Sequence, residues 1–125
     1  MTDATNIETK LNSIRKVVDT DITGCEIESV VEQGKKLASL IGLSAECMAS
    51  AKKTLENARL KAIMQLRSEN MQPSVLLKMA DAQCGVELAT YEYADRLNAS
   101  ISHQLDYYRT VISLHKTELE NSMKG

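Results

Sequence analysis

The chain has 125 residues, a formal net charge of −2 and a hydrophobic fraction of 43 %, and its aromatic residues are four tyrosines without Phe or Trp. This length suffices for one domain with a modest core, which Leu, Ile, Val, Ala and Met have to fill. Such a core suits helices better than a sheet sandwich, and one proline and five glycines leave long stretches uninterrupted. We therefore expect a single all-α domain over residues 1–125.

Several classes of protein and site are not expected. The sequence contains no apolar run of the roughly 18 residues that a membrane helix needs, and no signal peptide, so we expect a cytoplasmic protein. Cys25, Cys47 and Cys84 are widely spaced, which favours buried reduced thiols over a disulfide or a zinc site. Near His103 and His115 there is no arrangement of His, Cys or carboxylate residues that makes a metal site persuasive. Without a phosphate-binding glycine loop or a nucleophile elbow, no catalytic residue, metal or cofactor is predicted, and an enzyme is not expected.

Two capping boxes mark the expected starts of the first helices. Thr5 is followed three residues later by Glu8, and apolar residues then recur at helical spacing as far as Val18. Thr23 and Glu26 have the same three-residue spacing, and a second apolar stripe follows them. We therefore predict one helix from Thr5 to about Val18 and a second that begins near residue 26.

Further along the chain, glycine, serine and proline residues mark the expected boundaries between the remaining helices. Gly42 is a suitable C-terminal stop for the second helix, and Ser44 is a suitable cap for a third, basic helix at about 45–67. A polar loop is expected at 68–73, where the proline disfavours helix. Almost nothing interrupts a helix at about 74–121, so we predict short helices followed by one long C-terminal helix.

The length of that last helix predicts self-association. At 1.5 Å per residue it would span roughly 70 Å, more than a compact monomer of this size can cover. Part of its apolar stripe would then need another chain, which favours a homo-oligomer of the helical bundle or coiled-coil type. A kink at Gly85 that folds the helix back on itself is the competing solution. The residues expected at the oligomer interface are Leu97, Ile101, Leu105, Tyr108 and Ile112.

The charge is distributed unevenly along the chain. Residues 1–32 hold seven acids against three bases, and residues 68–95 hold five acids against one base. Between them, residues 50–67 hold five cations against the single carboxylate of Glu56. One interpretation is a solvated helix face, or a row of cations that meets acidic segments of a neighbouring subunit. The other is a surface for phosphates, whose contacts are Lys52, Lys53, Arg59, Lys61 and Arg67.

The order of these features resembles the UvsY recombination mediator proteins of tailed phages. The resemblance covers roughly residues 28–116 and lies in the basic "AKKTLENAR" at 51–59, the loop "SENMQPS", and the later segments "VLLKMAD", "YEYADRLN" and "LDYYRTVISLHK". It implies a small, ring-like helical homo-oligomer that binds single-stranded DNA. It also implies a role in loading a RecA-type recombinase onto strands coated by single-strand-binding protein.

The resemblance also bears on particular residues. The family's DNA-binding cations fall in a "KAR" segment, whose last two positions match Ala58 and Arg59, while Asn57 replaces the lysine. Lys52 and Lys53 match a preceding lysine pair. The alternative function is a helical structural, adaptor or inhibitory protein that acts through protein–protein contacts without binding DNA.

Overall fold

A computed structural model of the chain describes residues 3–22, 26–67 and 70–124. It contains four helices, α1 (Asp3–Val18), α2 (Ile27–Leu66), α3 (Pro73–Gln83) and α4 (Gly85–Lys124). No strand occurs among the described residues, and the expected all-α fold is confirmed. In place of short helices followed by one long one, two helices are long, since α2 and α4 have 40 residues each.

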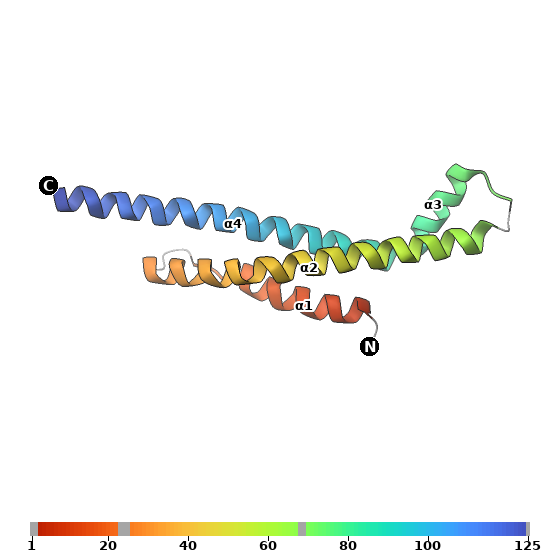
Figure 1. The fold of residues 1–125 in the computed structure, drawn as a ribbon, viewed down its shortest axis with the longest axis horizontal. Coiled ribbons are helices and arrows are strands. Elements are labelled where there is room, and N and C mark those ends of the chain that lie inside the picture. Colours follow the sequence, from red (N-terminus) through yellow and green to blue (C-terminus); the bar gives the residue numbers. More distant parts are fainter. Residues whose placement is uncertain (1–2, 23–25, 68–69, 125) are drawn as a thin grey trace.

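The helices form an elongated antiparallel bundle (Figure 1). Helix α4 runs back along α2, and the Ser44 hydroxyl of α2 donates a hydrogen bond to Asn98 Oδ1 of α4 at 3.2 Å. Helix α1 packs against both long helices, whereas α3 packs against the C-terminal end of α2. One end of the bundle is therefore three helices thick, and the α2–α3 end is only two helices thick.

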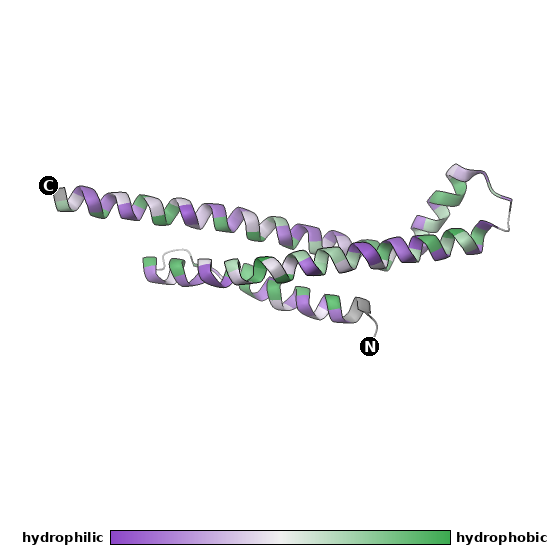
Figure 2. Cartoon of the chain, viewed as in Figure 1, coloured by the Kyte–Doolittle hydropathy of each residue, from purple (hydrophilic) through white to green (hydrophobic). Residues whose placement is uncertain are grey.

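Hydrophobic and hydrophilic residues are interspersed along every helix (Figure 2). The larger core cluster joins α1, α2 and α4, and its members Leu11, Ile14, Leu37 and Ile101 are fully buried. A smaller cluster lies between α2 and α3. It consists of Leu55, Ala62, Leu66, Ala80 and Cys84. Two alanines and a cysteine among five residues make this second core thin.

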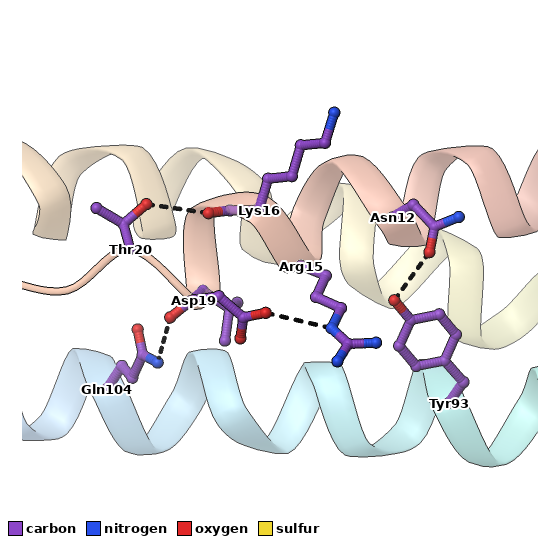
Figure 3. Close-up of polar contacts among 8 residues, drawn as sticks. Asn12, Arg15, Lys16, Asp19, Thr20, Tyr93 and Gln104 are labelled. Carbon is purple, nitrogen blue, oxygen red and sulfur yellow. Dashed lines mark hydrogen bonds and ion pairs between the residues drawn. The ribbon is translucent and has the colours of Figure 1, made fainter.

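The C-terminal end of α1 is held by two glutamines. The last carbonyls of a helix have no partner within it and need donors from elsewhere. Gln33 of α2 donates to the Val17 carbonyl at 2.6 Å. Gln104 of α4, which Figure 3 shows beside the end of α1, donates to the Val18 carbonyl at 2.8 Å. The Tyr93 hydroxyl adds a hydrogen bond to Asn12 Oδ1 at 3.0 Å. These bonds fix α1 along the groove between α2 and α4.

The predicted helix boundaries in the N-terminal half need correction. Helix α1 begins at Asp3, so Thr5 lies within its first turn rather than capping it. Helix α2 continues through Gly42, and the predicted stop there is wrong. Ser44 caps nothing, because its side chain is buried and bonded to α4. The Thr23 capping residue lies outside the described residues, and the N-cap of α2 is Glu26, without a side-chain hydrogen bond.

The predicted 74–121 helix is also wrong, because it is divided. Helix α3 ends at Gln83, and Cys84 follows with φ −103° and ψ 25° before α4 begins at Gly85. Burial of Ala80 and Cys84 against α2 turns α3 away from the axis of α4. The helix does not fold back on itself at Gly85, because α3 descends at a steep angle toward α2 and α4 then continues along α2 toward its N-terminal end (Figure 1). The loop ends at Gln72, and α3 begins at Pro73.

The apolar stripe of α4 is largely covered within one chain. Leu97, Ile101, Leu105 and Tyr108 are buried in the larger core cluster, and Ile112 is half-buried. The premise that these positions need a second chain is therefore wrong, although self-association itself remains a prediction. Exposed apolar side chains lie further along α4, at Leu114, Leu119 and Met123.

Candidate nucleic-acid interface

The five predicted phosphate contacts all lie at the C-terminal half of α2. Lys52, Lys53, Lys61 and the C-cap residue Arg67 are exposed, whereas Arg59 is half-buried. Among the described residues, none of the four exposed cations forms an ion pair. Since a continuous helix carries all five, their relative positions are set by its geometry of about 100° per residue.

That geometry separates the cations into two groups. Ala51, Leu55, Ala62 and Leu66 define the buried side of this half of α2. At about 100° per residue, the side of α2 that faces away from this buried side carries Lys53, Lys61 and Arg67. Lys52 and Arg59 lie at the edge of the buried side. The structure therefore brings three of the predicted contacts onto the outer surface of α2 and places Arg59 next to α3.

Arg59 has a partner within the chain. Its Nε donates to Asp81 Oδ1 of α3 at 2.9 Å, with side-chain exposures of 38 % and 54 %. An ion pair this exposed contributes only about 0.2–1 kcal/mol, but the nearby carboxylate offsets the charge that a phosphate would meet. Glu56, about one turn away on α2, forms no ion pair with Lys52 or Arg59 among the described residues. Arg59 thus serves first to link α2 with α3.

A polar groove extends the basic surface toward α1. It has a volume of about 380 Å³ and is lined by Asn6, Ile7, Lys10, Ser50, Lys53, Thr54 and Asn57. Lys10 was not among the predicted site residues, because it lies on a different helix and nothing local in the sequence connects it to Lys53. Lys10 lines the groove only because α1 packs against α2.

Cys47 and Cys84 are free and buried, as expected, while Cys25 lies outside the described residues. Burial raises the pKa of both thiols above their ordinary value of 9.0. Among the described residues there is no group of three or more His, Cys, Asp or Glu side chains arranged to hold a metal ion. None of the described helices is both long enough and apolar enough to cross a membrane.

We expect these two thiols to be unreactive in the folded protein. In a Cys25→Ser background, a maleimide at neutral pH should label the native chain far more slowly than the urea-unfolded chain, because the thiolate is the nucleophile and burial disfavours it. Since the folded pKa is raised, the associated stability is present below pH 9.0 and is lost as the pH rises through the folded pKa. Fast labelling of the native protein would contradict the burial of the thiols.

Comparisons of the chain with protein-family models, with curated proteins and with solved structures find no match. The arrangement of residues in the structure is therefore the basis for a proposed function.

Proposed function

We propose that the protein is a non-enzymatic accessory protein that binds single-stranded DNA, of the type that helps load a RecA-type recombinase onto strands coated by single-strand-binding protein. The observation that supports this proposal is the set of exposed cations on α2, namely Lys52, Lys53, Lys61 and Arg67. They have no acidic partner among the described residues, so their charge is available to phosphates. Arg59 contributes less than the sequence predicted, because it is paired with Asp81.

Binding of this kind is mainly electrostatic. Tyr91 packs against the core cluster that includes Leu55 and Ala62 of the basic half of α2, and its ring is partly buried there, so base stacking on aromatic rings adds little to this surface. Contacts made through lysines to phosphates tolerate any base sequence and weaken as salt is added. Self-association would repeat the cations of one chain along a strand, and a homo-oligomer is part of the proposal.

The proposal is tested with two matched lysine pairs on the same helix. Lys52→Ala with Lys53→Ala removes two cations from the proposed surface, and Lys35→Ala with Lys36→Ala removes two exposed cations from the opposite half of α2. We expect the first pair of changes to weaken binding of labelled single-stranded DNA several-fold. The slope of log affinity against log salt should also fall by about 0.7 for each phosphate that the variant no longer neutralises. Fluorescence anisotropy over a salt series measures both.

The Lys35/Lys36 variant should bind DNA almost as the unchanged protein does, although the total charge of the two variants is the same. Equal reductions of DNA affinity in both variants would mean that the net charge of the protein, and not the surface at Lys52 and Lys53, controls binding. Absence of binding by the unchanged protein at low salt would overturn the proposed function.

The adaptor function is the second candidate, and a specific observation favours it. Large apolar side chains are exposed at the thin α2–α3 end, where α1 does not reach. They are Leu60 and Met64 of α2 and Val75, Leu77 and Met79 of α3. Several large exposed apolar side chains at one end of a bundle favour a protein-binding surface. If the unchanged protein fails to bind DNA, this end of the bundle becomes the proposed functional surface.

A further inference from the structure

The polar groove between α1 and α2 has the composition of an anion site. Lys10 enters it from α1 and Lys53 from α2. Ser50, Thr54 and Asn57 supply hydroxyl and amide donors from α2, one helical turn apart or nearly so. No carboxylate is among the residues that line it. Two cations on separate helices, with neutral donors between them, suit a group that carries negative charge on several oxygens.

The side chain of Lys10 borders this groove. Among the described residues neither Lys10 nor Lys53 has an acidic partner within ion-pair distance. Lys10 lines the groove together with Ser50 and Lys53 of α2, so its side chain lies at the boundary between α1 and α2. Glu46 lies beside an adjoining recess that also contains Lys10, Cys47 and Leu43. That carboxylate stands outside the polar groove itself.

The position of Lys10 is set by how α1 is anchored. Gln33 and Gln104 hold the carbonyls at the end of α1, and the buried Ile7, Leu11 and Ile14 pack into the core. The side chain of Lys10 can still move, but its helix is fixed against α2. A ligand in the groove would therefore meet a largely preformed site, which reduces the ordering that binding requires.

We propose that this groove binds a phosphate group of the single-stranded DNA backbone, through the ammonium groups of Lys10 and Lys53 and the side chains of Ser50, Thr54 and Asn57. The source of the phosphate rests on the proposed function, whereas the affinity of the groove for phosphate does not. The strand would then cross from the outer surface of α2 to α1. The groove's volume of about 380 Å³ exceeds what one phosphate fills, which leaves room for part of the attached sugar.

The test compares two lysines of the same helix. Lys10→Ala removes a cation of the groove, whereas Lys16→Ala removes an exposed cation that lies on the outer side of α1 and does not line the groove. We expect Lys10→Ala to lower affinity for single-stranded DNA several-fold and to reduce the log–log salt slope by about 0.7. Lys16→Ala should leave both nearly unchanged, and Lys10→Arg, which keeps the charge, should restore most of the binding.

A second measurement separates the groove from the function. In ¹H–¹⁵N NMR spectra, inorganic phosphate should shift the amide resonances of Ser50 and Thr54 in the unchanged protein and not in Lys10→Ala. If phosphate shifts them but single-stranded DNA does not bind, the groove is an anion site and the proposed function is wrong. If DNA binds equally to the unchanged protein and Lys10→Ala, the groove is not the contact, while the proposed function stands. If neither ligand has an effect, both proposals are overturned.

Discussion

Replacing Leu105 by aspartate should unfold most of the protein, whatever its state of association. Leu105 is 7 % exposed and belongs to the core cluster that joins α1, α2 and α4. Removing a buried leucine side chain costs about 2–5 kcal/mol, and an unpaired buried carboxylate adds to that cost. Since small domains are stable by only about 5–15 kcal/mol, the destabilisation is comparable to the whole stability. Urea denaturation followed by far-UV circular dichroism measures it.

The matched control is Leu119→Asp on the same helix. Leu119 is 53 % exposed and lies beyond the buried part of α4, so the same change of residue should alter the free energy of unfolding by only about 0.5 kcal/mol. If Leu105→Asp leaves a stably folded chain and only lowers its molecular mass in light scattering, Leu105 belongs to a subunit interface and its packing within one chain is wrong.

Replacing Gly42 by proline should be nearly as damaging, because α2 is continuous at this position. Proline inside a helix removes a backbone hydrogen bond and clashes with the preceding turn, at a cost of about 3 kcal/mol or more. The damage would spread, since Leu37 before Gly42 and Cys47 after it are both buried in the same cluster. We expect the variant to unfold at a lower urea concentration than the unchanged protein. Circular dichroism, which reports helix content, measures this midpoint.

Gly42→Ala distinguishes a continuous helix from a helix end by the sign of its effect. Apart from its chain neighbours and the nearby backbone of its own helix, a methyl group added at Gly42 would meet no atom within 4 Å, and alanine favours a helix interior by about 1 kcal/mol over glycine. We therefore expect Gly42→Ala to raise the free energy of unfolding. At a helix end with a left-handed glycine, the same change would instead be destabilising. Destabilisation by alanine together with tolerance of proline would restore the stop predicted from the sequence.

Two of the boundary errors share one cause. A glycine followed closely by serine is a reasonable signal for a helix end, and the uninterrupted stretch after Pro73 is a reasonable signal for one long helix. Each is a local preference of about 1 kcal/mol per residue. Packing overrides both, because the buried residues on either side of Gly42 keep α2 intact, and the burial of Ala80 and Cys84 against α2 separates α3 from α4.

The candidate site was likewise predictable only in part. That residues 50–67 carry a cluster of cations follows from counting, and four of the five are exposed as a surface site requires. The pairing of Arg59 with Asp81 and the approach of Lys10 to Lys53 could not be predicted in this way. Both join residues on different helices, and a contact of that kind leaves no periodic signal in the chain.

By itself, the sequence determined that the protein is helical, that its cysteines at 47 and 84 are buried, and that its positive charge is concentrated in one segment. Composition and apolar spacing are enough for these properties because each depends on neighbours along the chain. Only the tertiary structure decided where α2 and α4 begin and end, that one chain covers Leu97, Ile101 and Leu105, and which cations stay without a partner among the described residues. These properties depend on which helices meet, and burial shared between distant segments outweighs the local preferences that a sequence displays.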